Sequence, residues 1–343
     1  MISEQLKQKL LENKELFPDI IGQNRTKLEI KSALVTNRNF IIVGPPGIGK
    51  TTLAKNIAGL LPSMDVVKGC SFHCSPKKPI CPDCKGKNDL KKIKIEGEQR
   101  FIRIQGSPDL SVEDLLGDID PIKAMKFGPL SMEAFTPGKI FKANNGLLFF
   151  DEVNRAPEKL QNAMLQVLEE NRATIGSYDI DIPANFIFIG TMNPEDFAGT
   201  EKLSDVFLDR FDIIYMTYPN KIEDEKEILD MKDINVAKFP AELLNSTIGF
   251  IQALRKNSNL EKLPSVRATI GLYERAQSNA FLSGRKSVQP KDIERAIVSV
   301  LSHRIKLKPS LRYLKTPSEF LKEEMNKFAE NHPEFRTKEG EGP

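Results

Sequence analysis

The pattern of apolar and polar positions divides the chain into two parts. Up to about residue 219, short apolar runs alternate with stretches whose apolar residues recur at helical spacing. The runs cover residues 40–43, 101–106, 147–150, 186–191 and 211–219. Continuous apolar runs of this length are typical of strands buried on both faces, and strands that alternate with helices usually form a parallel sheet. The first part is therefore predicted to be an α/β domain with a parallel sheet.

From residue 220 the apolar positions follow helical spacing with few strand signals, which predicts a second, all-helical domain. A chain of 343 residues is long enough for about two domains. We expect the first to cover 1–219, with an insertion at 62–100, and the second to cover 220–316. Residues 317–343 are expected to form a C-terminal helix and, from about residue 328, a polar disordered tail.

Composition narrows the class of protein only slightly. The 50 Lys and Arg residues nearly balance the 47 Asp and Glu residues, so the net charge is +3 and does not by itself indicate nucleic acid or an anionic membrane. No apolar run approaches the roughly 18 to 20 residues that cross a bilayer, and the polar N-terminus lacks the apolar core of a signal peptide. We therefore expect a cytoplasmic protein without a membrane span.

The first apolar run leads into a glycine-rich loop of the form G-x-x-x-x-G-K-[ST] at Gly44–Thr51. Backbone N–H groups of such a loop surround a β-phosphate, the lysine reaches the β and γ oxygens, and the threonine hydroxyl ligates Mg²⁺. The loop stands between a strand-like run and a helix-like stretch, which is the context that the motif requires. The predicted nucleotide-binding residues are Gly44, Pro45, Pro46, Gly47, Ile48, Gly49, Lys50, Thr51 and Thr52.

A second motif supplies the carboxylates that a P-loop enzyme needs. The run Leu147–Phe150 ends in Asp151 and Glu152, about a hundred residues after the loop. Asp151 is predicted to bind the Mg²⁺ shell with Thr51, and Glu152 is predicted to polarise the attacking water. Two solvated acids at a strand end are the plainer interpretation, and the complete P-loop favours the catalytic one. The sequence thus predicts an ATPase whose cofactors are ATP and Mg²⁺.

With these motifs in place, the chain resembles an AAA+ ATPase of the branch that contains MoxR proteins and the ATPase (I) subunit of magnesium chelatase. The resemblance runs from about residue 18 to 310 and includes the P-loop, 147–157, Gly190–Pro194 and Leu208–Phe211. It implies an αβα P-loop domain followed by a helical lid. It also implies a helix-2 insertion within 107–146 and a hairpin at 173–183.

The resemblance implies roles for three further residues. Asn193, at a strand end, would orient water beside Glu152; Arg210 would be an arginine finger offered to the γ-phosphate of a neighbouring subunit. Arg267, in a stretch that is similar to a sensor-2 motif, would reach the phosphate from the lid of the same chain. Taken alone, these residues have plainer interpretations as a capping asparagine and two surface arginines in ion pairs.

All four cysteines lie close together as Cys70-x3-Cys74-x6-Cys81-x2-Cys84. Four thiolates can form a tetrahedral structural zinc site, although the central gap is much shorter than the ~15 to 20 residues of an ordinary paired-CxxC site. An iron–sulfur cluster and a redox dithiol remain alternatives. His73 is expected to be a solvated loop residue rather than a ligand. The magnesium-chelatase subunit that the chain resembles usually lacks this cysteine set.

The resemblance implies a ring-forming motor or chaperone, expected to be a hexamer, that remodels a partner protein. Relatives commonly work with von Willebrand factor A-type partners in metal insertion or complex maturation. A helicase-like, nucleic-acid-dependent ATPase is the alternative; the predicted hairpin is acidic, and the five lysines of 85–94 lack interleaved aromatic residues, which favours a solvated face. A third class is a nucleotide-binding scaffold without turnover, against which the intact Glu152 argues.

Overall fold

The computed structural model describes residues 4–12, 15–81, 83–128, 131–174, 181–194, 203–232 and 234–336. The chain separates into two compact units, one formed by 1–44 and 49–216 and the other by 45–48 and 217–343. Each unit has its own cluster of buried apolar side chains. Within the described residues, we find no helix with both the length and the apolar character needed to cross a membrane.

The first unit is built on a five-stranded sheet in which all neighbouring strands are parallel. Its order is β11-β1-β10-β7-β4, so β1 is flanked on both sides by strands that follow it in sequence. The strands are β1 Phe40–Val43, β4 Phe101–Gln105, β7 Leu147–Asp151, β10 Ile187–Met192 and β11 Asp212–Tyr215. Every residue of β1 and β10 is buried, as their apolar runs predict. The predicted parallel α/β sheet is confirmed.

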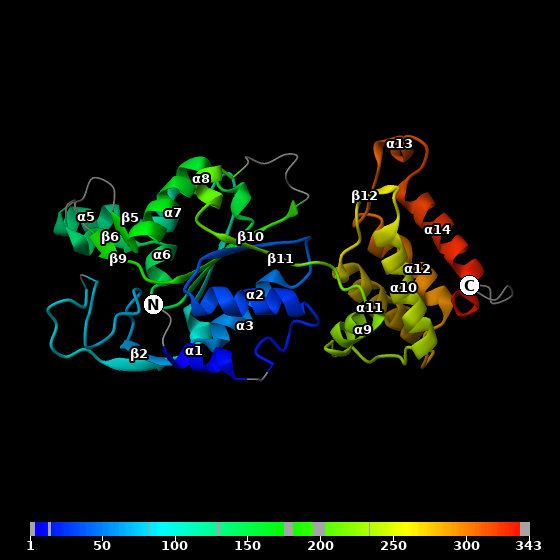
Figure 1. Cartoon of the computed structure of the whole chain (residues 1–343), viewed down its shortest axis with the longest axis horizontal. Helices are drawn as coiled ribbons and strands as arrows, with labels where there is room; N and C mark the ends of the chain where they lie inside the picture. Colours follow the sequence, from blue (N-terminus) through cyan, green and yellow to red (C-terminus); the bar gives the residue numbers. More distant parts are fainter. Residues whose placement is uncertain are drawn as a thin grey trace. The chain divides into compact units, whose positions relative to one another are not determined.

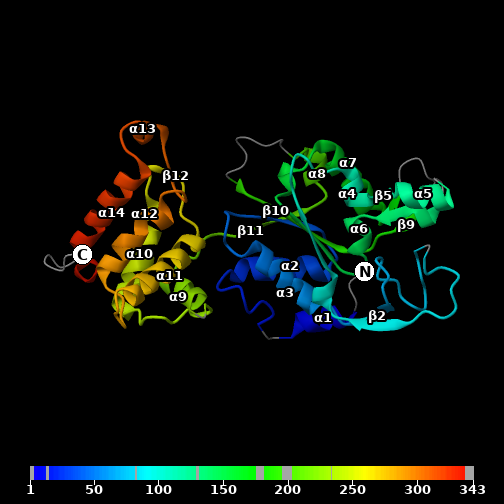
Figure 2. The same ribbon diagram turned by 180° about the vertical axis from the view of Figure 1, so that it is seen from behind.

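Helices cover both faces of this sheet. In Figures 1 and 2, α2 and α3 lie on one side of the sheet and α7 lies on the other. The helices of this layer arrangement are α1 Glu4–Leu11, α2 Asn24–Val35, α3 Lys50–Leu60, α7 Glu158–Glu170 and α8 Asp205–Leu208. The apolar side chains of α3 at Leu53, Ala54, Ile57 and Ala58 are buried, because helical spacing places them on one face.

The predicted insertion at 62–100 contains an antiparallel pair that the sequence pattern did not indicate. Strands β2 (Met64–Val67) and β3 (Lys92–Ile95) pair from Met64–Ile95 to Val67–Lys92 and enclose the cysteine loop. A short 3-10 helix, η1 (Gly97–Arg100), leads from β3 into β4. The lysines of β3 are exposed, and only Ile95 of that strand is buried, which explains why its composition resembles a solvated loop.

The segment between β4 and β7 consists of short elements, as the proline and glycine punctuation of 107–146 indicates. They are α4 Val112–Leu116, β5 Gly117–Ile119, α5 Pro121–Phe127, η2 Met132–Ala134, β6 Phe135–Pro137 and α6 Lys139–Lys142. Strands β5 and β6 pair antiparallel. Further on, β8 (Arg172–Thr174) and β9 (Asp181–Pro183) form the two sides of the predicted hairpin, whose tip at 175–180 lies outside the described residues.

The second unit is a helical domain. Its helices are α9 Ile222–Asp230, α10 Ala241–Lys256, α11 Val266–Leu282, α12 Pro290–Leu301, α13 Pro309–Arg312 and α14 Pro317–Asn331. It also contains a two-stranded pair, β12 Leu260–Lys262 with β13 Lys306–Leu307, which the helical pattern did not predict. The disorder predicted from about residue 328 was wrong for residues up to 336. Helix α14 and the 3-10 helix η5 (Pro333–Phe335) continue there, and Phe335 packs on Phe250. Residues 337–343 lie outside the described residues.

A buried ion pair joins three helices of this unit. The carboxylate of Glu225 on α9 is fully buried and accepts hydrogen bonds from Arg255 on α10 and from Thr269 Oγ1 on α11, the latter at 2.7 Å. The guanidinium of Arg255 also lies 4.7 Å from the ring centre of Tyr218. A charge buried this deeply is tolerated because its partners satisfy it, so removing one partner leaves the other unpaired in an apolar setting.

We therefore expect Glu225→Ala to lower the free energy of unfolding of the helical unit by about 3 to 5 kcal/mol, since Arg255 loses its counterion. Urea unfolding followed by circular dichroism measures this loss. Glu223→Ala is the matched control, because Glu223 lies on the same helix but is exposed. Equal effects of the two substitutions would contradict the role given to the buried pair.

Candidate functional site

The predicted P-loop follows β1 and ends at the first turn of α3. Gly49 has φ 98° and precedes Lys50, the first residue of that helix, so its left-handed backbone turns the chain from the loop into the helix. The Nζ atom of Lys50 donates to the backbone carbonyl of Gly44 across the loop. The N–H groups at the start of α3 have no carbonyl four residues earlier within the helix, and they are the natural site for an anion.

Three strands bring the predicted motifs to one edge of the sheet. Strands β1, β10 and β7 are parallel neighbours, so their carboxyl ends lie at the same edge. At this edge the N–H of Gly44 donates to the carbonyl of Met192 at 3.2 Å, which places the start of the P-loop beside the end of β10. Asn193, half-buried, directly follows β10 at the same edge.

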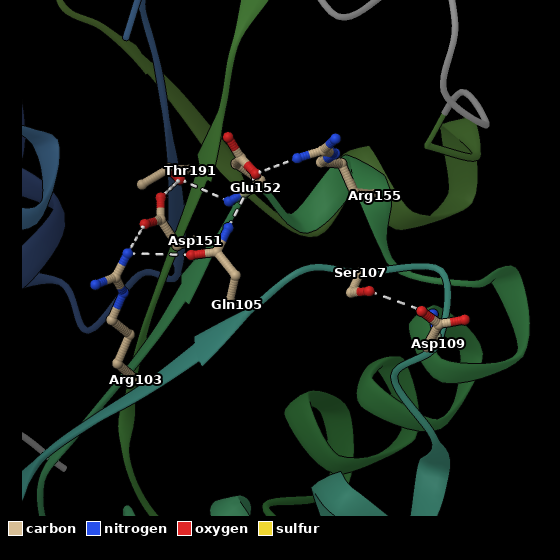
Figure 3. Close-up of polar contacts among 8 residues, drawn as sticks. All are labelled: Arg103, Gln105, Ser107, Asp109, Asp151, Glu152, Arg155 and Thr191. Atoms are coloured by element: carbon tan, nitrogen blue, oxygen red, sulfur yellow. Dashed lines mark hydrogen bonds and ion pairs between the residues drawn. The ribbon is translucent and has the colours of Figure 1, made fainter. Parts of the chain in front are cut away.

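Thr191 joins the end of β10 to the two carboxylate residues at the end of β7, Asp151 and Glu152. Its hydroxyl donates to Asp151 Oδ1 at 2.7 Å and accepts the backbone N–H of Glu152 at 2.9 Å (Figure 3). Thr191 is fully buried, and the Asp151 side chain is only 14% exposed. A hydroxyl that both donates and accepts in this way fixes the orientation of the Asp151 carboxylate and of the peptide that carries Glu152.

Glu152 is held in a definite geometry by its backbone and by two side chains. It has φ 54°, a left-handed conformation that costs a residue other than glycine of order 1 to 3 kcal/mol and is concentrated at functional sites. Its Oε2 accepts hydrogen bonds from Gln105 Nε2 at 2.9 Å and from Arg155 Nη1 at 2.8 Å (Figure 3). Arg155 belongs to η3 (Val153–Arg155), the 3-10 turn that directly follows Glu152.

The edge strand β4 contributes residues that sequence reasoning missed. Arg103 Nη2 lies 2.5 Å from Asp151 Oδ2 and 3.1 Å from Gln105 Oε1, so β4 supplies partners for both carboxylates. The strand closes tightly on β7, because Gly106 N–H donates to Asp151 O at 2.7 Å and a Cβ at Gly106 would meet the Glu152 carbonyl oxygen at 2.0 Å. The only signal in the sequence was polar residues in an otherwise apolar run.

The two predicted arginines lie elsewhere. Arg210 follows α8 and forms an ion pair with Glu169 of α7, with Nε at 2.5 Å from Glu169 Oε1, while its Nη1 donates to Val206 O at 2.7 Å. Arg267 is exposed in the first turn of α11. It belongs to the helical unit, whereas the carboxylates belong to the first unit, so its reach to a nucleotide stays a prediction.

The four cysteines come together as a second cluster. Their Sγ atoms all lie within 4.8 Å of one another, and three of the four residues are buried. The backbone N–H groups of Ile80 and Cys81 donate to Cys74 Sγ at 3.3 and 3.4 Å. Hydrogen bonds from Cys74 and Cys81 lower the pKa of the Cys70 thiol, and burial raises the pKa of the Cys84 thiol to about 11.

His73 differs from its expected solvated state. It is half-buried, has φ 48°, and its burial lowers the pKa of the imidazole, so the ring is neutral near pH 7. It does not belong to the metal-ligating group that the described residues form, which consists of the four cysteines. That His73 is not a ligand stays a prediction. The predicted solvent exposure of its side chain was wrong, because the loop packs onto the first unit and half-buries the ring.

A P-loop at the end of β1, with an aspartate and a glutamate at the end of β7, defines a P-loop nucleoside triphosphatase. Three family profiles match the chain: "Magnesium chelatase, subunit ChlI" over 16–72, "ATPase family associated with various cellular activities (AAA)" over 86–213, and "AAA lid domain" over 262–324. The chain thus combines an AAA+ ATPase domain with an AAA lid, and it is similar to the ATPase subunit of magnesium chelatase. It hydrolyses ATP, and its cofactors are ATP and Mg²⁺.

Individual proteins agree with this assignment. The magnesium-chelatase subunit ChlI homolog of Methanocaldococcus jannaschii is 27% identical over 326 residues, which cover 85% of this chain and 86% of that protein. The magnesium-chelatase subunit ChlI of Synechocystis is 26% identical, over 85% of this chain and 88% of that protein. A chain in a structure of the complex between subunits BchI and BchD of magnesium chelatase shares the fold, with TM-score 0.52, 23% identity and coverage of 89% of this chain and 98% of that one.

Glu152→Gln should leave binding of Mg·ATP intact and reduce hydrolysis by orders of magnitude, because the charge that activates water is lost while Asp151 remains. Lys50→Ala should instead weaken nucleotide binding. Turnover by a coupled phosphate assay and binding of a fluorescent ATP analogue separate the two effects. Near-normal turnover in purified Glu152→Gln would remove Glu152 from the catalytic role.

Proposed function

We propose that this chain is a chelatase-I-type motor subunit that assembles into a ring of six and uses ATP hydrolysis to remodel a partner protein, in metal insertion or complex maturation. The observation that carries the proposal is the carboxyl edge of the sheet, where the P-loop, Asp151, Glu152 and Asn193 follow three adjacent parallel strands. The similarity to magnesium-chelatase subunits over 85% of the chain supports this kind of motor over other P-loop enzymes.

In the proposed mechanism, the P-loop residues Gly44–Thr52 would hold the triphosphate, and Thr51 and Asp151 would hold Mg²⁺, which would neutralise charge on the phosphates. Glu152 polarises the attacking water and Asn193 orients it, while Arg267 contacts the γ-phosphate from the lid. Gln105 and Arg155 act as positioning residues, because their hydrogen bonds fix Glu152 Oε2. Both donors bind the same carboxylate oxygen, so release of at least one of them would free that oxygen to accept a hydrogen bond from the attacking water.

We further propose that Arg210 acts across a subunit boundary as an arginine finger. Within one chain Arg210 pairs with Glu169, and the two side chains are 32% and 51% exposed. An exposed pair of this kind is worth about 0 to 1 kcal/mol, so a γ-phosphate with its multiple negative charges competes well for the guanidinium. The intrachain pair is therefore compatible with a finger that changes partner on assembly.

The partner is proposed to be a second subunit, of the von Willebrand factor A type, with which the ring works. This part of the proposal is taken from the relatives: a solved complex of magnesium chelatase contains BchI together with BchD. Co-purification of the tagged chain with its co-expressed genomic neighbours tests it, with ATPase stimulation as the readout. Stimulation by single-stranded or duplex nucleic acid, with none by any protein, would favour the helicase-like alternative.

Zinc is proposed as a further, structural cofactor at Cys70, Cys74, Cys81 and Cys84. Bonds of about 2.3 Å from zinc to sulfur place the corners of a tetrahedron about 3.8 Å apart. The Cys70 and Cys81 sulfur atoms are 3.6 Å apart, and all four lie within 4.8 Å, so the cluster fits a zinc ion with small adjustments. Four thiolates leave no open position for a water, which makes the site structural rather than catalytic.

Catalysis across a subunit boundary predicts a specific result on mixing two inactive variants. Arg210→Ala and Lys50→Ala should each be inactive alone, by at least about a hundredfold, since one lacks the finger and the other the phosphate-binding lysine. Mixed before assembly, they should regain measurable ATPase activity, because some interfaces then pair an intact P-loop with an intact finger. Specific activity of the wild-type protein should also rise with protein concentration.

The matched control is a mixture of Arg210→Ala with Glu152→Gln and Lys50→Ala combined in one chain, which still supplies intact fingers. It should be rescued as well as the first mixture, because the receiving P-loop and Glu152 belong to the Arg210→Ala chain. A specific activity independent of protein concentration, together with no rescue in either mixture, would show that Arg210 does not act in trans.

A further inference from the structure

The cysteine loop between β2 and β3 packs against the apolar core of the first unit. Phe72, Cys74, Cys81 and Cys84 are each less than 5% exposed and belong to the same apolar cluster as Leu148 of β7. The ring of Phe72 lies 5.3 Å from that of Phe141 on α6. The described residues between β2 and β3 contain no helix and only one isolated bridge, Ser75–Lys78. The loop is thus held on the core through its cysteines.

Two asparagines connect this loop to the start of two central strands. Asn144, 3% exposed, donates from Nδ2 to the Phe72 carbonyl at 2.9 Å and accepts the Asn185 N–H on Oδ1 at 3.1 Å. Asn145 donates from Nδ2 to the His73 carbonyl at 3.4 Å, and its N–H donates to the Asn185 carbonyl at 2.6 Å. Phe72 and His73, whose carbonyls accept these side-chain bonds, lie between the first two cysteines.

The asparagines stand where β7 and β10 begin. Gly146 follows Asn145 and precedes β7, and its carbonyl accepts the N–H of Ile187, the first residue of β10, at 3.0 Å. Asn144 therefore sits between the cysteine loop on one side and the junction of β7 with β10 on the other. The opposite ends of these strands carry Asp151 and Thr191.

We infer that a metal ion bound by the four cysteines acts as a brace for the sheet. When the ion is bound, the amino ends of β7 and β10 are fixed through Asn144, and when it is lost these ends loosen. The inference rests on the proposed zinc and goes beyond it by assigning the ion a target in the sheet. The Phe72 carbonyl is held in place only while the loop around it is folded, and the loop's described residues have too little regular structure to fold without a ligand.

The family matches do not assign this role. The magnesium-chelatase profile ends at residue 72, and the AAA profile begins at residue 86. Cys74, Cys81 and Cys84 fall between them. The brace also lies a full strand from the chemistry, since the five residues of β7 span about 17 Å between Gly146 and Asp151. Metal loss should for that reason act first on the stability of the strands and not on the hydrolytic step itself.

Hydrogen exchange measured by mass spectrometry tests the brace directly. Anaerobically purified wild-type protein should contain one zinc ion per chain. A high-affinity chelator should accelerate exchange in 70–84 and also, by about tenfold, in peptides that cover 144–147 and 185–188, where the bonds named above lie. Asn144→Ala should retain zinc and show less than about a twofold effect of chelation at 185–188, because only the long Asn145–His73 hydrogen bond of 3.4 Å then connects the loop to this junction.

Asn39→Ala is the matched control. Asn39 Oδ1 accepts the N–H of Phe188 in β10 at 3.3 Å, so its loss weakens the same strand without touching the cysteine loop. This variant should retain both the zinc and the tenfold response to chelation. If Asn144→Ala does not fold, chelation of the wild-type protein still tests whether metal loss accelerates exchange at 144–147 and 185–188.

Three results would overturn the brace: absence of bound metal, an effect of chelation confined to 64–95, or a full response at 185–188 in Asn144→Ala. Iron with labile sulfide would replace zinc and likewise contradict the closed zinc site. ATPase activity does not enter these readouts. A protein that shows the expected exchange pattern but does not act on a partner would refute the proposed function and leave the brace intact.

Discussion

The structure of the nucleotide site depends on one buried hydroxyl, that of Thr191. It donates to Asp151 and accepts from the backbone of Glu152, so one residue of β10 orients the metal-binding acid and the peptide of the catalytic acid on β7. Because β10 is also hydrogen-bonded to β1, the same strand fixes the start of the P-loop. Binding and hydrolysis need these groups in register, and a parallel sheet provides that register with few side-chain contacts.

The two ends of the central strands are held by different means. At the carboxyl ends, Arg103, Gln105 and Arg155 surround the two acids with partners that are partly exposed and therefore exchangeable. At the amino ends, the connection to the cysteine loop runs through the buried Asn144, whose bonds are costly to break. This division suits a motor, since the chemistry requires partners that change while the sheet must keep its shape through many cycles.

Local motifs were predictable from the sequence, and contacts between distant segments were not. The P-loop, the Asp151–Glu152 pair and the parallel sheet follow from residue order and apolar runs, because each is defined by neighbours in the chain. Strand order is not defined by chain neighbours, so no pattern indicated that Gln105 pairs with Glu152 or Arg103 with Asp151. In the same way, cysteine spacing indicated a metal site but not its connection to Asn144. The strands β12 and β13 have only three and two residues, too few for a pattern.

The most direct test of this account is the ATP turnover of Thr191→Val, which removes the hydroxyl and nearly keeps the volume. We expect a loss of about tenfold or more at saturating Mg²⁺ and ATP, with nucleotide binding retained, because the two buried hydrogen bonds of this hydroxyl, worth about 1 kcal/mol each, no longer position the two acids. Thr191→Ser should stay close to the wild-type rate. Unchanged turnover in Thr191→Val would contradict the claim that this hydroxyl organises the site.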